Sequence, residues 1–334
     1  MSHLLNCMGE MLIDFLPIEE HEATVGFHMH AGGSPMNVAV GLARLEQPTA
    51  FTGKISTDFF GRYLRNHIER EGIDTRFLID SLALSTLAFV ASEDGEPAYS
   101  FYGEGAADTL LTLDELPKPF FTDTRILHVG SISLLRGSTP VAILSAIEQL
   151  KGQALISLDP NIRAGLVRDE DGYRAVLDQC FALADVVKMS QVDLEWFAPG
   201  RPLEEVATQI LSRGPGLVVV TQGGNGALAV RMATRAAIHD AADLDVSKGV
   251  AYLHVPAFEV DVVDTVGAGD AFSAGLLAGL AEHDVTSRAP LAHLSPEDLE
   301  AVVRFAGATS ALTCTRAGAN PPTRAEVEQF LYAS

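Results

Sequence analysis

Basic residues are scarce in this 334-residue chain. Its 23 lysines and arginines stand against 44 aspartates and glutamates, which gives a formal net charge of −21. An acidic surface of this size repels both a phosphate backbone and an anionic membrane, so we expect neither nucleic acid nor membrane as a partner. Small phosphate ligands remain possible, because a local group of backbone amides can hold a phosphate within an acidic field.

A secretory leader and long apolar runs are also missing. No lysine or arginine comes before Arg44, and Glu10 and Asp14 interrupt the early apolar stretch, so the sequence has neither part of a signal peptide. No apolar run approaches the roughly 18–20 residues that span a bilayer. We therefore expect a cytoplasmic protein.

Cysteine is rare and odd in number. Cys7, Cys180 and Cys314 are widely spaced, which suits reduced core thiols better than a disulfide framework. Apolar residues, in contrast, are plentiful at 47% of the chain. This proportion is ordinary for a globular protein with a sizeable core.

Short apolar runs alternate with longer helical patterns over most of the chain. The runs predict buried strands at 126–129, 154–158, 186–188 and 217–221. The patterns predict helices at 35–45, 59–71, 139–150, 203–213, 271–280, 296–314 and 324–332. This alternation favours an α/β fold with a mainly parallel central sheet flanked by helices, whose ligands bind beyond the carboxyl ends of the strands. We expect residues 1–334 to form one such domain.

Four stretches break the alternation. Phe15–His30 and Thr86–Tyr102 lack a helical period. They can pair as a small β-sheet lid, over about residues 13–31 and 85–108, or they can be plain surface loops. A lid over a phosphoryl-transfer site would exclude water, which competes as acceptor. The polar stretches 238–250 and 282–295 are expected to be solvent loops.

The strongest local signal lies at 260–280. A strand-like run, Val260–Val263, leads into the glycine turn Gly267-Ala268-Gly269, and an amphipathic helix follows. Amides at such a turn, with the positive end of the helix dipole, can hold a phosphate or a developing oxyanion. Asp270, which opens the helix, would then act as a general base beside the phosphate. Taken alone, Asp270 fits better as an N-cap or as a complement to the dipole.

Other phosphate-binding loops match poorly. The Gly53-Lys54 pair lacks both the following Ser or Thr and the earlier glycine of a Walker A loop. At the 267–270 turn, Phe272 occupies the third glycine position of a dinucleotide fingerprint. Residues 224–229 fit the loose fingerprint but lead into 227–231, which we interpret as a strand.

A second glycine motif, AGGSPMN, occupies residues 31–37. We interpret Ser34 as the cap of a helix with Pro35 in its first turn. The glycine pair is consistent with a tight turn alone. Alternatively, the backbone of Gly32 and Gly33, with the amide of Asn37, hydrogen-bonds the hydroxyls of a polyol.

These two segments resemble, in their order and separation, the two signatures of the ribokinase-like (PfkB) carbohydrate kinases. The segments are GGSPMNVAVGLARL and DTVGAGDAFSAGLLAGL, and the resemblance extends from about residue 9 to residue 330. Further stretches are similar to bacterial fructokinases: GEMLIDF (9–15), FYGEGAADTLL (101–111), HVGSISLL (128–135), DPNIRAGL (159–166) and TCTRAGANPPTRAEV (313–327). The resemblance implies a ribokinase-like three-layer fold with a β-sheet lid, and ATP-dependent phosphorylation of a sugar, D-fructose to fructose 6-phosphate. It also implies Mg²⁺, a possible requirement for K⁺, and a possible homodimer through the lid.

The resemblance also implies roles for individual residues. The catalytic group would be Asp270 with Gly267, Ala268 and Gly269. The sugar site would contain Asp14, Gly32, Gly33, Asn37, Phe101 and Arg163. The nucleotide site would contain Lys188, Ser190, Asp193, Thr221, Gly223, Gly226, Gly307 and Ala308. Asp264, with the backbone near Gly318, would bind a monovalent cation.

Some of these residues have simpler interpretations. Asp14 can be a surface acid at a strand end, and Arg163 can pair with a nearby carboxylate instead of facing the substrate. Ser190 and Asp193 stand where many relatives carry the Asn and Glu of an Asn-x-x-Glu motif. Because both are shorter, their direct part in placing magnesium is open.

The lid sequence bears on the rival functions. Ketodeoxygluconate kinases carry Tyr-Tyr-Arg where this chain has Phe101-Tyr102-Gly103, which argues against an acidic sugar, although Arg163 keeps that substrate open. Ribokinase and nucleoside kinase are further alternatives within the family. A non-catalytic sugar sensor should have lost Asp270 or its glycine turn, and a nicotinamide oxidoreductase should carry the dinucleotide fingerprint.

Overall fold

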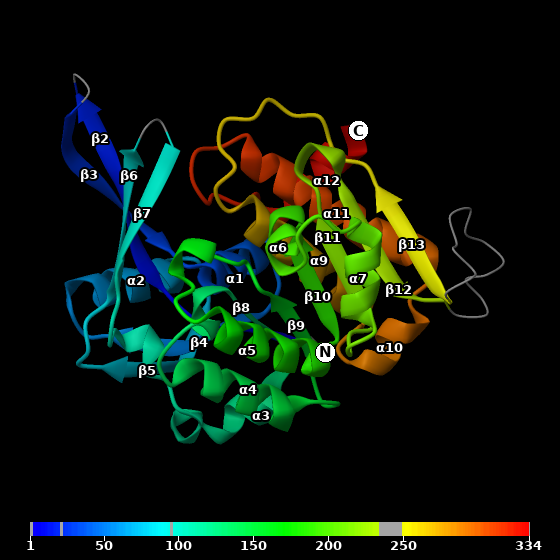
Figure 1. Ribbon diagram of the computed structural model, residues 1–334, viewed down its shortest axis with the longest axis horizontal. Helices are drawn as coiled ribbons and strands as arrows, with labels where there is room; N and C mark the ends of the chain where they lie inside the picture. Colours follow the sequence, from blue (N-terminus) through cyan, green and yellow to red (C-terminus); the bar gives the residue numbers. More distant parts are fainter. Residues whose placement is uncertain (1–2, 21–22, 94–95, 234–248, 334) are drawn as a thin grey trace.

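A nine-stranded sheet forms the centre of the computed structural model, which describes residues 3–20, 23–93, 96–233 and 249–333 (Figure 1). The strand order within these ranges is β13-β12-β11-β10-β9-β8-β1-β4-β5. The strands are β1 (Leu4–Met8), β4 (Thr49–Ser56), β5 (Asp74–Ser81), β8 (Thr124–Gly130), β9 (Leu155–Asp159), β10 (Val186–Ser190), β11 (Leu217–Thr221), β12 (Ala227–Met232) and β13 (Val250–Val255). All neighbours from β5 to β11 are parallel, and β12 is antiparallel to β11 and β13.

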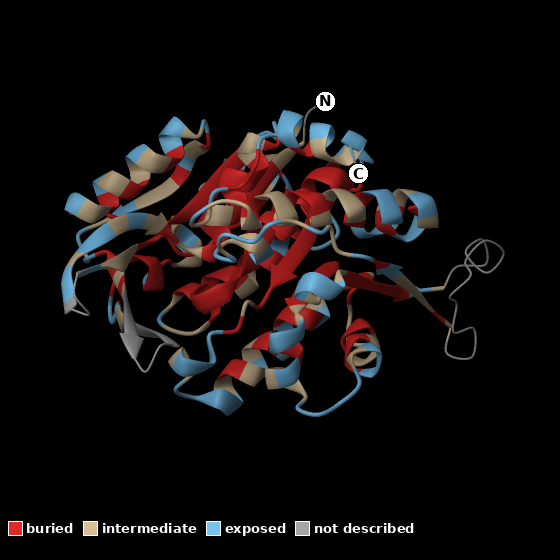
Figure 2. Cartoon of the chain, turned by 90° about the horizontal axis from the view of Figure 1, so that it is seen from above, coloured by how far each residue is buried: buried red, intermediate tan, exposed pale blue. Residues whose placement is uncertain are grey.

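The parallel strand β11 is apolar on both of its faces because helices cover both sides of the sheet. In β11, Val218, Val219 and Val220 are all fully buried, although consecutive side chains point to opposite faces. The expected mainly parallel α/β sheet is therefore confirmed. Figure 2 shows this buried layer between exposed outer helices.

Two hydrophobic clusters, one on each face, hold the helices to the sheet. One face carries α1 (Ser34–Arg44), α2 (Phe59–Arg70), α9 (Ala268–Glu282), α10 (Arg288–His293), α11 (Pro296–Cys314) and α12 (Arg324–Ala333). The other carries α3 (Lys118–Asp123), α4 (Thr139–Leu150), α5 (Glu170–Leu183), α6 (Gln191–Phe197) and α7 (Leu203–Leu211). Short 3₁₀ turns lie at Ala107–Thr109, Leu113–Glu115, Ser131–Leu134, Ala164–Leu166 and Gly223–Asn225.

Helix α9 is buried between α1 and α11. Every residue from Asp270 to Ala281 is buried, so the expected amphipathic stripe is wrong: the helix is apolar all round, as suits a central position. Its small residues permit the close packing. A Cβ added to Gly275 would lie 2.7 Å from Cα of Ala306 in α11.

A separate four-stranded sheet forms the lid, as the sequence predicted, and projects from one side of the main sheet (Figure 1). It contains β2 (Leu12–Glu20), β3 (Ala23–Gly32), β6 (Thr86–Glu93) and β7 (Glu96–Tyr102), in the order β3-β2-β6-β7. The rings of Phe15 and Phe89 stack at 4.6 Å between centroids, and Phe15 also meets Phe60 of α2 edge-on at 5.8 Å. These aromatic contacts fasten the sheet to the main fold.

Two local predictions are wrong. The run Val260–Val263 is not a strand: Val262 and Val263 are 63% and 65% exposed, and the amides of Val263 and Asp264 donate to the carbonyl of Cys314 at the end of α11. The stretch 282–295 is not all loop, because it contains α10. Most of the other predicted loop, residues 238–248, lies outside the described residues.

Two expectations about composition can be compared with the described residues. Cys7 and Cys180 are buried, Cys314 is half-buried, and all three are free thiols. No helix in the described ranges is long and apolar enough to cross a membrane.

Candidate active site

A cavity of about 690 Å³ opens where the carboxyl ends of the central strands face the lid. It gathers residues that the sequence places far apart. The predicted site residues that line it are Asp14, Gly32, Gly33, Asn37, Phe101, Arg163, Lys188, Asp264, Gly267, Gly269, Asp270 and Gly318. This position agrees with the rule that open α/β sheets bind ligands beyond the carboxyl ends of their strands.

Asp270 lies in the first turn of α9 and is not its N-cap. The helix begins at Ala268 and its N-cap is Gly267, with a left-handed φ of 76°. The first hydrogen bond of the helix runs from the amide of Ala271 to the carbonyl of Gly267, at 2.8 Å. The amides of Gly269 and Asp270 precede that bond, so they take no part in the helical ladder and are available at the positive end of the dipole.

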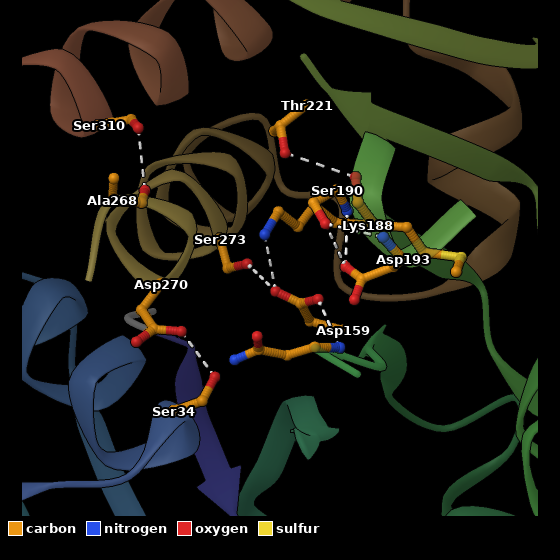
Figure 3. A network of polar contacts seen from close by, with 12 residues as sticks. Ser34, Asp159, Lys188, Ser190, Asp193, Thr221, Ala268, Asp270, Ser273 and Ser310 are labelled. Carbon is orange, nitrogen blue, oxygen red and sulfur yellow. Dashed lines mark hydrogen bonds and ion pairs between the residues drawn. The ribbon is translucent and has the colours of Figure 1, made fainter. Parts of the chain in front are cut away.

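Two side chains of α1 hold the carboxylate of Asp270. Ser34 Oγ donates to Oδ1 at 2.6 Å (Figure 3), and Asn37 Nδ2 donates to Oδ2 at 2.8 Å. Burial raises the pKa of Asp270, while these two hydrogen bonds lower it. A buried carboxylate with a raised pKa and a fixed orientation is a better proton acceptor than a solvated one.

Ser34 is therefore not the cap that we expected. The N-cap of α1 is Gly33, with φ of 116°, and Ser34 is the first residue of the helix. Its hydroxyl points to Asp270 instead of the end of its own helix. The sequence pattern Ser-Pro suggested a cap because local propensities carry no information about Asp270, which lies 236 positions further along the chain.

A buried ion pair lies beside the glycine turn (Figure 3). Lys188 Nζ in β10 is 2.8 Å from Oδ2 of Asp159 at the end of β9, and the two side chains are 5% and 1% exposed. Ser273 of α9 also donates to Asp159, at 3.2 Å. Burial acts to lower the pKa of Lys188, but Asp159 outweighs it and the pKa is raised, so the ammonium stays charged.

This ammonium group is directed at the turn that precedes Asp270. A Cβ added to Gly269 would lie 3.0 Å from Lys188 Nζ. The absence of a side chain at Gly269 therefore leaves the positive charge and the free amides on the same small surface. Such a surface stabilises the oxygens of a phosphoryl group in transfer.

The lid contributes the opposite wall of the cavity. Asp14 is half-buried within β2 rather than exposed at a strand end, and a Cβ on Gly32 would collide with its carboxylate. Burial raises the pKa of Asp14 to about 6, although Arg163 acts to lower it. Arg163 NH1 donates to Oδ1 of Asn161 at 2.6 Å, so this arginine both faces the cavity and has a local partner.

The polar pair Ser190 and Asp193 forms a capping box at the start of α6. Asp193 Oδ2 accepts from the amide and hydroxyl of Ser190 at 2.8 and 2.7 Å, and Oδ1 accepts from the amide of Ile162 at 2.7 Å. Both carboxylate oxygens are thus engaged within the protein. This geometry favours a part for Asp193 in positioning the β10–α6 turn.

The remaining predicted nucleotide residues do not line the cavity. Thr221 ends β11, Gly223 is the first residue of the 3₁₀ turn that follows, and Gly226 comes directly after that turn. Gly226 has φ of 90°, and a Cβ there would collide with the carbonyl of Val255, so the tight turn requires glycine. Figure 3 shows Thr221 beside Ser190 and Lys188, at the ends of adjacent strands.

Gly307 and Ala308 lie on α11, apart from the cavity lining. A Cβ on Gly307 would lie 3.7 Å from the ring of Phe258, and Ala308 is fully buried. Ala268 is tied to the same helix, because Ser310 Oγ donates to its carbonyl at 2.9 Å. The structure thus brings α11 against the start of α9.

The loops of Asp264 and Gly318 meet, as the resemblance implies. Asp264 Oδ2 accepts from the amide of Gly318 at 2.7 Å, and Oδ1 accepts from the amide of Val266 at 3.0 Å. A cation needs oxygen ligands, and of these contacts only the carboxylate supplies them. In the described ranges, no group of three His, Cys, Asp or Glu side chains could hold a metal ion. Mg²⁺ that arrives with a nucleotide needs few ligands from the protein, because phosphate oxygens and water complete its shell.

Sequence reasoning missed several residues of the site: Glu10, Ser34 as a ligand of Asp270, Ser133, Asp159, Asn161 and Ser273. All of them lie in stretches that resemble the family: Asp159 and Asn161 in DPNIRAGL, Ser133 in HVGSISLL, and Ser34 and Ser273 in the two signature segments. Glu10 belongs to GEMLIDF, another such stretch. The contacts of Ser133 and Ser273 depend on tertiary packing alone.

Comparisons with known proteins agree with this geometry. The pattern of the pfkB family carbohydrate kinases matches residues 2–326. A fructokinase from Rhizobium leguminosarum bv. trifolii is 34% identical over 296 residues, which is 89% of this chain and 85% of that protein.

Solved structures are similar over the whole chain. The fructokinase of Xylella fastidiosa with bound ATP has a TM-score of 0.87 and 30% identity, covering 100% of this chain and 99% of that one. A double mutant of the fructokinase from Vibrio cholerae O395, with fructose, ADP and potassium bound, has a TM-score of 0.81 and 29% identity, covering 99% and 98%.

Proposed function

This chain belongs to the pfkB family of carbohydrate kinases, and we propose that it transfers the terminal phosphoryl group of ATP to the 6-hydroxyl of D-fructose. The observation that carries the proposal is the buried Asp270 carboxylate, held by Ser34 and Asn37 and preceded by the free amides of the glycine turn. Fructokinases are also prominent among its relatives at moderate identity.

The transfer would proceed in one displacement. Asp270 accepts the proton of the sugar hydroxyl. At the same time the hydroxyl oxygen forms a bond to the terminal phosphorus of ATP, and the bond from that phosphorus to ADP breaks. The free amides of Gly269 and Asp270, with the ammonium of Lys188, stabilise the oxygens of the group in transfer, and Gly267 and Ala268 shape the turn that presents them. The proton then leaves Asp270 for solvent and restores the base.

The lid would orient the sugar. Asp14 can accept from two sugar hydroxyls with its two oxygens, and Gly32, Gly33 and Asn37 also line the cavity. Phe101 of β7 and Arg163 complete the wall around the far end of the acceptor. In this arrangement the sugar contacts both the lid and the main sheet. The bound sugar therefore fills the space between them and excludes water from the site.

We assign the nucleotide to the strand ends beside this cavity. Thr221, Gly223 and Gly226 would lie beneath the phosphates, Ser190 and Asp193 beside them, and Gly307 and Ala308 against the base. Mg²⁺ would neutralise phosphate charge when bound, and K⁺ is proposed for the loop of Asp264 and Gly318, since the Vibrio cholerae fructokinase structure contains potassium.

A ketodeoxygluconate kinase is the second candidate. It is favoured by Arg163, whose guanidinium faces the cavity near Asp14 and could pair with a substrate carboxylate. It is disfavoured by Tyr102, which is 65% exposed and does not line the cavity, and by Gly103 in place of an arginine.

A panel of acceptors tests the proposal. Purified protein with Mg-ATP is assayed for ADP release with fructose, ribose, ketodeoxygluconate, adenosine and glucose. We expect fructose to give the highest kcat/KM. Turnover on fructose no higher than on glucose would overturn the substrate, preference for ketodeoxygluconate would support the second candidate, and no turnover with any acceptor would favour a sensor.

A further inference from the structure

Glu10 is a buried acid between β1 and β2 to which no role has been assigned. It is 1% exposed and lies in the lining of the cavity below Ser34. One carboxylate oxygen, Oε1, accepts from the amide of Ser34 at 3.2 Å, and the other accepts from the hydroxyl of Ser133. The amide of Glu10 donates back to Ser133 Oγ at 2.8 Å. Both ends of the residue are thereby fixed.

The bond to Ser34 meets a need of helix α1. The first amides of a helix require acceptors from outside it, and a side chain at the N-cap usually supplies one. In this structure Asp58, Asp169, Ser190 and Ser295 cap their own helices in this way. The N-cap of α1 is Gly33, which has no side chain. Glu10 provides the acceptor instead, from 24 positions away.

Gly33 cannot be exchanged for a residue that would cap α1 itself. Its φ of 116° is unfavourable for other residues, and an added Cβ would lie 2.7 Å from the carbonyl oxygen of Glu10. The positive φ of Gly33 and its close approach to the backbone of Glu10 therefore exclude a side-chain cap at this position. Capping from a distant strand end is the arrangement that remains.

The first turn of α1 carries both donors to Asp270. Ser34 and Asn37 are three positions apart and project from that turn to the two oxygens of one carboxylate. We propose that Glu10 is a positioning residue for the kinase reaction: it caps α1 from the end of β1 and so fixes Ser34 and Asn37 against the base Asp270. The proposal rests on the proposed function for its effect on catalysis, but the capping contact can be measured independently.

An acid at this position carries a cost that its hydrogen bonds must offset. Burial raises the pKa of Glu10 to about 7, against the lowering effect of Ser133 and Ser131, and Asp108 is the charged neighbour that raises it further. A buried carboxyl is unfavourable unless its oxygens are hydrogen-bonded. Here the bonds run to the start of α1 and to the turn after β8, which are both walls of the cavity.

Three variants separate positioning from bulk stability. Glu10→Ala removes the acceptor, and Glu10→Gln keeps a carbonyl oxygen that can accept from the amide of Ser34. The matched control is Asp185→Ala, because Asp185 is also buried, at 5% exposed, and accepts the amide of Ile156 at 2.9 Å, before β10 and outside the cavity. Each variant is assayed for kcat, for KM of ATP and for thermal unfolding.

We expect Glu10→Ala to lower kcat about ten-fold or more with KM for ATP changed by less than about two-fold, since an interaction that serves the transition state is lost. Glu10→Gln should regain most of that kcat. Asp185→Ala should lower the melting temperature and leave kcat per folded molecule unchanged. Equal kcat in Glu10→Ala and wild-type enzyme would overturn the proposal. If Glu10→Ala does not fold, Glu10→Asp decides, because its shorter side chain keeps the charge but cannot reach the amide of Ser34.

Two further measurements identify the route of the effect. Contacting residues give non-additive effects, so Glu10→Ala should cost less kcat in a Ser34→Ala background than in the wild type. Additive losses would contradict action through Ser34. Amide hydrogen exchange at Ser34, Met36 and Asn37 should accelerate in Glu10→Ala and not in Asp185→Ala. The exchange rates test the cap even if the wild-type protein phosphorylates no sugar. That lack of activity would contradict the proposed function and leave the cap untouched. Unchanged exchange would remove the cap.

Discussion

The hydroxyl of Ser34 donates a 2.6 Å hydrogen bond to Oδ1 of Asp270, although the two residues are 236 positions apart. This bond joins the two glycine motifs of the sequence into one site. One motif places amides next to the base, and the other supplies the donors that orient it. A carboxylate has about four acceptor sites on its two oxygens, so Asp270 can still accept from a sugar hydroxyl while Ser34 and Asn37 fix its orientation.

Asp270→Asn should lower kcat by roughly 10²–10⁴-fold, the usual contribution of a positioned general base. The amide keeps the shape of the side chain but accepts no proton, so KM for the sugar should change little. Coupled ADP release measures turnover, and thermal unfolding verifies that the variant is folded. Near-normal kcat would remove Asp270 from its proposed role.

Ser34→Ala should move the acidic limb of the kcat profile to higher pH. In the proposed mechanism Asp270 acts as a base when it is ionised, and the hydrogen bond from Ser34 lowers its pKa. Removing this donor therefore raises the pKa, and more alkaline conditions are needed to ionise the carboxylate. Ser310→Ala is the control, because Ser310 donates to the carbonyl of Ala268 in the same turn and not to the carboxylate. An unshifted limb in Ser34→Ala would contradict this interpretation.

Lys188→Met should destabilise the protein by about 3–5 kcal/mol, because it leaves the buried carboxylate of Asp159 without its partner. The double variant Lys188→Met with Asp159→Leu should recover much of that free energy of unfolding, since the uncompensated charge is gone. Neither variant should recover turnover, because the ammonium beside Gly269 is lost in both. Urea denaturation and ADP release measure the two effects. An active double variant would show that Lys188 serves the fold only.

Two glycines of α9 should respond differently to alanine. Gly269→Ala places a Cβ 3.0 Å from Lys188 Nζ. Because the ammonium must then shift from the position proposed for the phosphate, kcat should fall roughly ten-fold or more. Gly275→Ala meets the backbone of Ala306, so it should cost about 1–3 kcal/mol of stability by overpacking. Activity per folded molecule should survive in the second variant. The opposite pattern would contradict the assignment of Gly269 to the site.

Glu10→Gln should stabilise the protein at alkaline pH. The pKa of Glu10 rises from the model-compound value of 4.5 to about 7 on folding, so the folded state binds the proton more tightly and loses stability as pH rises between these values. At pH 8 the penalty is about 3 kcal/mol at 1.36 kcal/mol for each pH unit. Glutamine has no such titration. Its advantage in melting temperature should therefore be large at pH 8 and small at pH 5.

Local pattern predicted much of the fold because its elements carry strong periodicity. The helix at 296–314 and the strand at 217–221 begin and end in the structure where the sequence placed them. The run Val260–Val263 misled because β-branched residues favour strands, whereas its amides find an acceptor at the end of α11 instead of a neighbouring strand. That acceptor belongs to a helix that comes later in the chain.

The site was predictable where chemistry is concentrated in a motif. The Gly267–Asp270 turn and the Gly32-Gly33 pair can be recognised from the local sequence, and residues of both line the cavity. Glu10 and Asp159 cannot be recognised in this way, because a single acid at the end of an apolar strand forms no periodic pattern and no motif with a second residue. Their importance depends on the amide of Ser34 and the ammonium of Lys188, and only folding brings these groups together.

The separation between lid and main sheet has a consequence for evolution. The groups that would handle phosphate, Lys188 and Asp270, belong to the main fold. Asp14 and Phe101 belong to two hairpins that, within the described residues, form a sheet separate from the main one. Substitutions on the lid strands can therefore alter which sugar is accepted while leaving the transfer machinery intact. New substrates become accessible to such a chain by drift in a few strand residues, without rebuilding its chemistry.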